Sequence, residues 1–319
     1  MSIQEQGKFC IIINPYAGNG RGKHFLDHFS DAVQALGGTV FISQYQGHSV
    51  ILAKEAARNF RFIFAGGGDD TVREVLQGMY AARRVLGILP LGTFNNMAAS
   101  LYLPSDPLEC LQASLNGRIG RIDIGKIKGG PLFIENIGIG LDAYVWSKAP
   151  LEEPRGFRRW LTGLKLGVSS VFDFQPQSYT ISINDHKPVE IKDVLQITAA
   201  NSRCYCAGIQ IAPQAKINDG LLDICILSNM SKLKFLALAP FAFFGAHINR
   251  STSVYYCQAK KITVDSRHTA PVRVDGMLFS QLPVSVAALK ESQHMLLPES
   301  SLNSPAFLRK SYPTQIMPE

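Results

Sequence analysis

The first third of the chain alternates short apolar runs with longer amphipathic ones. Residues 9–13 form an apolar run of strand length, and residues 22–36 carry apolar side chains at the spacing of one helix face. The alternation continues with expected strands at 39–43, 61–65 and 85–89 and expected helices at 50–59 and 71–82. Strands that alternate with helices in this way are typical of a doubly wound α/β domain with a parallel sheet.

The pattern changes after residue 123, where short β-like runs replace the long helices. These runs cover 119–127, 132–137, 179–183, 193–199, 221–227, 261–264, 272–274 and 284–288. Many short strands in succession predict an antiparallel sandwich or barrel. Two stretches with helical spacing, 155–171 and 232–247, interrupt the series.

A chain of 319 residues usually forms more than one domain. We expect an α/β domain at 1–125, to which about 290–305 return, and a β-rich sandwich domain at 126–289. The tail 306–319, rich in Ser and Pro, is expected to be disordered.

Charge and cysteine content narrow the class of protein only in part. The formal net charge of +7 attracts phosphates, nucleic acid or an anionic membrane surface without choosing among them. The six cysteines include no C-x-x-C pair, so neither a zinc site nor a disulfide framework is indicated. Residues 1–8 lack the apolar core of a secretory signal, and the apolar run 235–246 is shorter than the roughly 20 residues that span a bilayer. We therefore expect a cytoplasmic protein.

The loop after the first strand, residues 14–23, contains three glycines and ends in Lys23. Glycines between a buried strand and a helix N-terminus let backbone N–H groups approach a phosphate. The loop is not a Walker A loop, because Ala17 and His24 stand where that motif needs Gly and Ser or Thr. It is not a dinucleotide G-x-G-x-x-G loop either, because Lys23 replaces the third glycine. Taken alone, it is equally well explained as a tight turn.

Two further loops repeat this arrangement. Residues 66–71 (GGGDDT) and 90–98 (PLGTFNNMA) each follow an expected buried strand. Consecutive glycines allow close backbone approach to a ligand, and a following helix directs partial positive charge at an anion, although a flexible glycine turn is the alternative. Loops at the carboxyl ends of parallel strands converge on the crevice where open α/β sheets bind nucleotides.

The order of these motifs resembles a known family. N-P-x-A-G at 14–18, G-G-D at 67–69 and P-L-G-T-x-N-x-x-A at 90–98 are followed by RIDIG at 121–125, NIGIGLDA at 136–143 and KINDGLLD at 216–223, and 274–276 stand where the family has D-G-E. Together they resemble the diacylglycerol kinase catalytic domain family, which includes bacterial lipid kinases, sphingosine kinases and ceramide kinases. The resemblance extends from about residue 8 to about 298. It implies an NAD kinase/diacylglycerol kinase-like fold, with a nucleotide-binding α/β domain, a β-rich lipid-binding domain and catalysis in the cleft between them.

The resemblance also implies a reaction and its participants. The γ-phosphoryl group of ATP would pass to the hydroxyl of a diacylglycerol-like or sphingoid lipid, with Mg²⁺ as cofactor and a role in lipid metabolism and phospholipid biosynthesis. ATP would lie against Asn14, Ser43, Gly67, Gly68, Asp69, Thr71 and Thr93, and Mg²⁺ against the carbonyls of Lys216 and Leu221 and the side chain of Asp219. We expect contact with the inner face of a membrane as a peripheral partner and no nucleic-acid partner, and we leave a homodimer open.

Two departures from the family pattern bear on turnover. Asp70 replaces the third glycine of G-G-D-G-T, where we expect a strained positive φ and a like-charge contact that opposes nucleotide binding by roughly 4 kcal/mol. Met277 replaces the D-G-E glutamate, and losing a positioned base typically costs about 10² to 10⁴-fold in rate. Asp69, Asp275 or water would then have to accept the proton. The alternative is a catalytically impaired member that binds lipid or nucleotide as a regulatory protein.

Other features leave choices open. His247 either faces the active cleft or is a hydrogen-bonded core histidine, and we favour the core. The apolar run 235–244 is either core or, together with Arg155, Arg158, Arg159 and Trp160, a membrane contact. NAD kinases and phosphofructokinases also carry G-G-D loops, but they lack the other two motifs in this order.

Overall fold

The computed structural model describes residues 8–148, 157–205 and 208–307, without the side chains of 157–164. The chain divides into two compact units. Among the described residues, the first unit comprises 8–124, 216–219 and 289–307, and the second comprises 125–148, 157–205, 208–215 and 220–288. Residues 216–219 thus join the first unit, whereas the boundaries expected from the sequence place them in the second domain.

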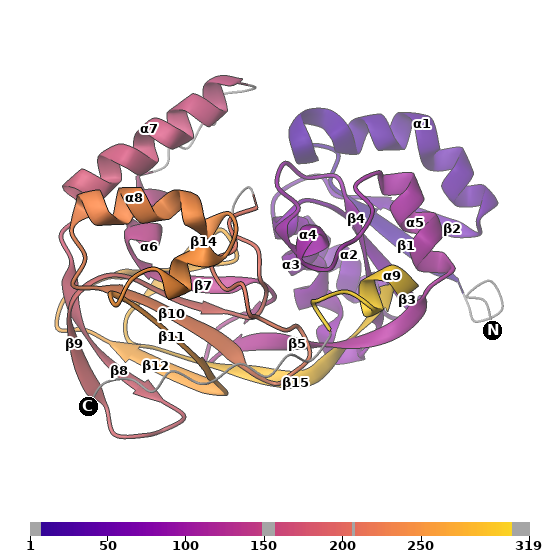
Figure 1. Ribbon diagram of the computed structural model, residues 1–319. Helices are drawn as coiled ribbons and strands as arrows, with labels where there is room; N and C mark the ends of the chain where they lie inside the picture. The colour runs from indigo at the N-terminus through magenta and orange to yellow at the C-terminus, as the bar shows by residue number, and fades with distance from the viewer. Residues whose placement is uncertain (1–7, 149–156, 206–207, 308–319) are drawn as a thin grey trace. The chain divides into compact units, whose positions relative to one another are not determined.

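The first unit is an α/β fold around a parallel sheet (Figure 1). Its strands lie in the order β2-β1-β3-β4-β15, and each neighbouring pair is parallel. The elements are β1 (Phe9–Ile13), η2 (Ala17–Gly20), α1 (Arg21–Ala35), β2 (Gly38–Ile42), α2 (His48–Ala56), β3 (Phe62–Gly67), α3 (Asp69–Met79), η3 (Tyr80–Ala82), β4 (Val85–Pro90), α4 (Asn96–Ser100), α5 (Pro107–Leu115), β5 (Arg118–Ile127) and α9 (Glu299–Leu302). Strands β5 and β15 (Val284–Leu297) each contain residues of both units.

Helices cover both faces of this sheet. On one face, Phe25 of α1 and Leu111 of α5 cluster with Phe9 and Ile11 of β1. Helices α2 and α3 contact β1 and β3 and pack closely on each other, since a Cβ at Gly78 would lie 2.2 Å from the Val50 carbonyl oxygen. The doubly wound parallel sheet predicted from the alternating pattern is therefore confirmed.

The second unit is an antiparallel β-sandwich. Strand β9 pairs with β7, β8 and β10. Each of these three strands pairs in turn with others: β10 with β11, β7 with β13 and through it β14, and β8 with β12 and through it β15. The elements are β6 (Leu132–Phe133), β7 (Asn136–Gly140), α6 (Leu141–Ser147), α7 (Phe157–Asp173), β8 (Gln177–Ile183), β9 (Val189–Ala200), β10 (Leu222–Ser228), α8 (Lys232–Ala242), η4 (Ala246–Asn249), β11 (Val254–Ala259), β12 (Lys261–Asp265), β13 (Pro271–Val274) and β14 (Met277–Gln281).

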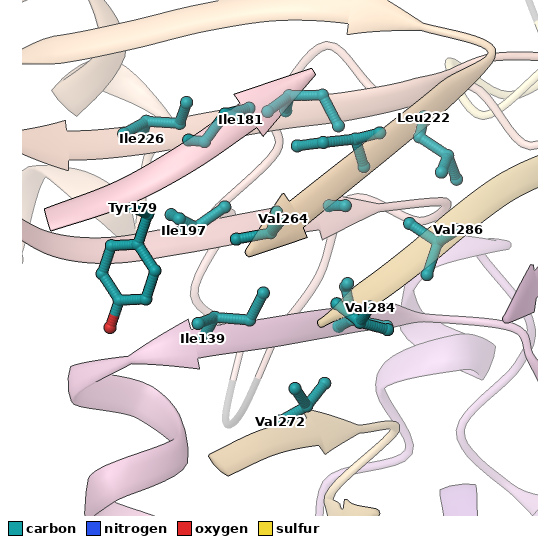
Figure 2. Close-up of a cluster of buried hydrophobic side chains, with 14 of the residues drawn as sticks. Ile139, Tyr179, Ile181, Ile197, Leu222, Ile226, Val264, Val272, Val284 and Val286 are labelled. Carbon is teal, nitrogen blue, oxygen red and sulfur yellow. The ribbon is translucent and has the colours of Figure 1, made fainter. Parts of the chain in front are cut away.

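The sandwich has a core of β-branched and aliphatic side chains from facing strands. Figure 2 shows Ile139, Ile197, Ile226, Val264 and Val286 among them, all buried. Alternate residues of β10 point the other way, where Cys225 and Leu227 join a second cluster formed with α6, α7 and α8. These three helices lie together on one side of the strands (Figure 1). Strand β10 is therefore buried on both faces, which explains the four consecutive apolar residues from Ile224 to Leu227.

Three expectations concern the ends and inserts of the chain. The stretch expected to be helical at 155–171 overlaps α7, which runs to Asp173, and the one at 232–247 contains α8. Arg155 and the side chains of Arg158, Arg159 and Trp160 lie outside the described residues. Ala306, in the tail expected to be disordered, is buried and its carbonyl accepts the Ile217 N–H (3.2 Å), while 308–319 lie outside the described residues. Within the described part of the chain, no helix combines the length and the apolar character needed to cross a bilayer.

Candidate functional site

Three loops of the first unit lie side by side at the carboxyl ends of β1, β3 and β4. The Asn14 N–H donates to the Gly66 carbonyl (2.9 Å), and the N–H groups of Leu91 (3.0 Å) and Gly92 (3.1 Å) both donate to the Gly67 carbonyl. Parallel strands end at the same edge of a sheet, so the loops that follow them meet. The loops predicted separately from the sequence form one backbone-lined surface.

Glycine is required where these loops touch. A Cβ at Gly92 would lie 2.3 Å from the Gly68 Cα, and a Cβ at Gly18, whose φ is +59°, would lie 2.2 Å from the Leu91 carbonyl oxygen. Both distances are below any that a real Cβ atom adopts, and backbone cannot move aside as a flexible side chain can. The glycines therefore hold the three loops at backbone contact distance.

The Asp69 carboxylate links the second loop to the third. Its two oxygens accept the N–H groups of Asn96 (Oδ2, 3.0 Å) and Met97 (Oδ1, 3.0 Å), the first two residues of α4. The N-cap residue Asn95 instead bonds Gly92 through both side-chain atoms, at 2.8 and 3.0 Å. Since both Asp69 oxygens already accept hydrogen bonds, this geometry suits positioning of the third loop better than proton transfer.

Asp70 does not have the positive φ expected from the sequence. It takes a helical φ as the second residue of α3, so the expected backbone strain is absent. Its side chain is 66% exposed and pairs with Arg73 at 3.5 Å. A carboxylate in the first turn also interacts favourably with the helix dipole.

The other residues expected to bind the nucleotide lie on or beside the same loops. Thr71 is buried over Gly67, where a Cβ would lie 2.2 Å from the Thr71 Oγ1. Ser43 is buried, and its N–H donates to the Ile13 carbonyl (2.9 Å). Asn14 Oδ1 accepts the Tyr16 N–H (3.0 Å), and Thr93 is exposed. The residues expected to bind the nucleotide therefore all lie on or beside the three loops of the first unit.

An aromatic pair close to Ser43, formed by Tyr45 and His48, was not singled out from the sequence. The rings of Tyr45 and His48 stack with centroids 4.6 Å apart and planes 7° from parallel, and the Gln44 N–H donates to His48 Nδ1 (3.1 Å). Tyr45 is 58% exposed, and exposed aromatic rings are surfaces on which a base can stack. An aromatic residue shortly after a strand, before a glycine and a histidine, was the available signal.

The expected magnesium-binding residues lie on one segment, 216–221. Lys216 and Asp219 belong to the first unit and Leu221 to the second. The segment is tied to its surroundings, because the Ile217 carbonyl accepts the Asp123 N–H (2.6 Å). No cluster of three His, Cys, Asp or Glu is found in the part of the chain that the structure describes. Two carbonyl oxygens and a carboxylate are nevertheless hard oxygen donors of the kind that Mg²⁺ prefers, so the residues fit the ion.

Asp275 has a structural task in the second unit. With Gly276 it forms the two-residue turn between β13 and β14, both at positive φ (41° and 82°), as in a type I′ hairpin. Its buried carboxylate accepts the N–H groups of Ile134 (2.7 Å), Glu135 (2.9 Å) and Asn136 (3.0 Å). These bonds favour a positioning role over the proton transfer considered from the sequence.

Met277 follows this turn as the first residue of β14. It is paired with Val274 across the hairpin and is half-buried. Met277 follows the Asp275–Gly276 turn directly and occupies the position where the family has glutamate.

A buried ionic cluster in the second unit was also missed. Arg273 Nε donates to Asp142 Oδ2 (2.6 Å), and the Tyr205 hydroxyl donates to Asp142 Oδ1 (2.5 Å). Arg273 also donates to the Asn136 side chain and lies over the Tyr205 ring, 4.7 Å from its centre. Burial opposes the charge on Arg273, but the neighbouring carboxylate outweighs it and raises the Arg273 pKa above its ordinary value. The pair joins residues 131 positions apart, a distance that no local sequence signal bridges.

His247 lies in η4 and is buried, with 2% of its surface exposed. Its interior position agrees with the favoured expectation. Burial lowers the pKa of His247 below its ordinary value of 6.5, because the charged imidazolium is poorly solvated there.

We expect His247→Leu to flatten the acid dependence of stability. Below pH 6.5 the unfolded chain binds a proton at His247 that the folded chain does not, so folding stability falls by up to about 1.4 kcal/mol per pH unit until the folded-state pKa is reached. Urea unfolding at pH 7 and pH 5 measures this: the variant should lose less stability on acidification than wild type. His268→Leu, at an exposed histidine, is the control. Equal acid loss in His247→Leu and wild type would contradict the assignment.

Comparison with known proteins supports the expected resemblance. The family model described as "Diacylglycerol kinase catalytic domain" matches residues 8–127, and that described as "YegS C-terminal NAD kinase beta sandwich-like domain" matches residues 136–297. A diacylglycerol kinase of Bacillus subtilis (strain 168) is 29% identical over 297 residues, covering 91% of this chain and 96% of the relative.

Two further relatives agree with this result. A protein of Chromohalobacter salexigens named "Probable lipid kinase YegS-like" is 31% identical over 236 residues, covering 72% of this chain and 74% of its own. The crystal structure of a diacylglycerol kinase from Bacillus anthracis superposes with a TM-score of 0.70 at 20% identity, covering 92% of this chain and 98% of that one. At this identity the structural similarity shows the fold, which matches the two units described above.

Proposed function

The chain belongs to the diacylglycerol kinase and YegS-like lipid kinase family and is a kinase, and from this premise we propose that it transfers the γ-phosphoryl group of ATP to the hydroxyl of a lipid such as diacylglycerol. The observation that carries the proposal is the meeting of three glycine loops at the carboxyl ends of β1, β3 and β4. Phosphoryl transfer depends mainly on positioning and on neutralising charge, which backbone N–H groups and helix N-termini provide.

Each of these groups of residues has a role in this proposal. The loops that contain Gly18, Gly67 and Gly92 bind the phosphates, and Asp69 fixes the third loop through α4. Lys216, Asp219 and Leu221 would hold Mg²⁺, which when bound neutralises charge on the transferring phosphoryl group. Tyr45 offers a stacking surface for the base of the nucleotide.

We expect Gly92→Ala to weaken ATP binding about tenfold or more, equivalent to about 1.4 kcal/mol. The added Cβ would force the second and third loops apart, because it would lie 2.3 Å from the Gly68 Cα. Isothermal titration calorimetry with ATP and Mg²⁺ measures the change.

Two control variants separate this effect from general damage. Gly167→Ala makes the same chemical change where nothing lies within 4 Å of the new Cβ, and it should leave binding unchanged. Asp70→Asn removes a charge from the second loop, and it too should bind ATP normally because that side chain is exposed. Wild-type affinity in Gly92→Ala, with circular dichroism unchanged, would contradict the proposed phosphate surface.

A second candidate is a regulatory protein that binds lipid without turnover. Met277, which cannot accept a proton, is the observation that favours it. Purified protein incubated with labelled ATP, Mg²⁺ and mixed micelles of diacylglycerol, sphingosine or ceramide separates the two functions. The kinase proposal expects one lipid to become labelled. Lipid binding without any labelled lipid would establish the second candidate.

A further inference from the structure

One face of helix α8 is apolar and open to solvent. Leu233, Ala237 and Phe241 are exposed and recur at the spacing of a single helix face, and the exposed Phe244 follows two residues after the end of the helix, with Leu233 at 72% and Phe244 at 82% exposure. We call these residues, together with the exposed Pro240 between them, the α8 stripe. The opposite face of the helix packs on the sandwich through Phe235, Leu236 and Leu238.

The end of α7 extends this surface. Val168 and Phe172 are exposed at 40% and 48%, and the Lys232 ammonium at the start of α8 donates to the Phe172 carbonyl. Isolated exposed apolar side chains are common, but large ones gathered on two adjoining helices mark an interaction surface.

Positive charge surrounds the α8 stripe. No Asp or Glu occurs between residues 224 and 264. Lys232 and Lys234 lie in the first turn of α8, and the Arg250 guanidinium lies 4.0 Å from the centre of the Phe241 ring. The nearby acid on α7, Asp173, forms an ion pair with Lys148 (3.1 Å).

We propose that the α8 stripe and the end of α7 form the surface on which this protein docks to an anionic lipid bilayer. This inference rests on the proposed function, since a kinase whose acceptor is a lipid must reach a membrane. Apolar side chains enter the boundary between headgroups and acyl chains, and the lysines and Arg250 neutralise lipid phosphates. At 11 residues, α8 is about 16 Å long, so it lies in the interface instead of crossing the bilayer.

Charge favours a bilayer over a second copy of the chain. A twofold pairing would place each stripe on its counterpart and bring the cations Lys232, Lys234 and Arg250 of the two copies together, whether the helices run parallel or antiparallel, with no acid in the segment to relieve the repulsion. An anionic bilayer supplies the missing negative charge across the whole surface.

Vesicle sedimentation without ATP tests the surface independently of catalysis. Wild-type protein should bind vesicles of phosphatidylcholine with about 30% phosphatidylglycerol at low salt, and less to phosphatidylcholine alone or at high salt, where charges are screened. Leu233→Gln with Phe244→Gln should weaken binding about tenfold or more. Lys234→Gln with Arg250→Gln should weaken binding to the anionic vesicles only, roughly fivefold for each charge removed.

A matched control has the same chemistry at exposed apolar positions away from the α8 stripe. Ile51→Gln with Val189→Gln should bind vesicles like wild type. In mixed micelles, where the lipid is dispersed in detergent, Leu233→Gln with Phe244→Gln should phosphorylate lipid like wild type. Circular dichroism and urea unfolding like those of the wild type show that this variant folds.

The outcomes separate the surface from the reaction. Wild-type vesicle binding by Leu233→Gln with Phe244→Gln overturns the docking surface, as does no binding by the wild type. A dimer that becomes a monomer in this variant, with vesicle binding unchanged, overturns it in favour of self-association. Loss of vesicle binding in this variant supports the docking surface even if the wild type labels no lipid, a result that would refute only the kinase proposal.

Discussion

Met277→Glu should raise kcat for lipid phosphorylation by about 10² to 10⁴-fold, the range over which a positioned general base acts. The Asp275–Gly276 turn that precedes Met277 is built from backbone pairing and from three N–H bonds to the Asp275 carboxylate, none of which involves the Met277 side chain. Because Met277 is half-buried at the start of β14, a glutamate of similar length fits there without remaking the hairpin.

The matched control for this prediction is Met277→Gln. Glutamine has the shape of glutamate but cannot accept a proton from the lipid hydroxyl, so its kcat should stay near that of the wild type. The measurement is initial rate against lipid in mixed micelles at saturating ATP. Equal rates in the glutamate and glutamine variants would show that this position does not supply the base.

The architecture of both units was predictable from local patterns. The run 9–13 is β1, and the helix expected at 22–36 is α1, because burial imposes its periodicity on the sequence. Helix α5 was missed although Asp106 caps it by accepting the Glu109 N–H (2.8 Å) and Pro107 occupies its first turn. Strand β14 was missed because four of its five residues are exposed and carry no alternating pattern.

Long-range contacts explain what the sequence did not reveal. Asp275 is bonded to Ile134, 141 residues away, so its structural role is invisible to any local motif. Asp70 illustrates the opposite error. Its place in the motif suggested backbone strain. In the structure, α3 begins at Asp69, before the expected start at residue 71, so Asp70 has an ordinary helical φ.

Arg273→Met should destabilise the second unit by about 3 to 5 kcal/mol, because it leaves Asp142 buried without its cationic partner. The two side chains are 2% and 10% exposed and lie 2.6 Å apart, so water cannot replace the lost bond. Both tryptophans of the chain, Trp146 and Trp160, belong to the second unit, so tryptophan fluorescence during urea unfolding reports on it selectively.

The double variant Arg273→Met with Asp142→Asn separates loss of the pair from loss of packing. If the uncompensated carboxylate is the main cost, neutralising it should recover at least about 2 kcal/mol, which gives a coupling energy within the range for residues in direct contact. The Trp146 indole N–H donates to the Tyr205 hydroxyl (3.4 Å), which in turn bonds Asp142, so its emission should also report the local change. Additive losses in the double variant would mean that the two residues stabilise the unit independently. Recovery would identify the ion pair as one element, in which each charge is tolerated in the interior only because the other is present.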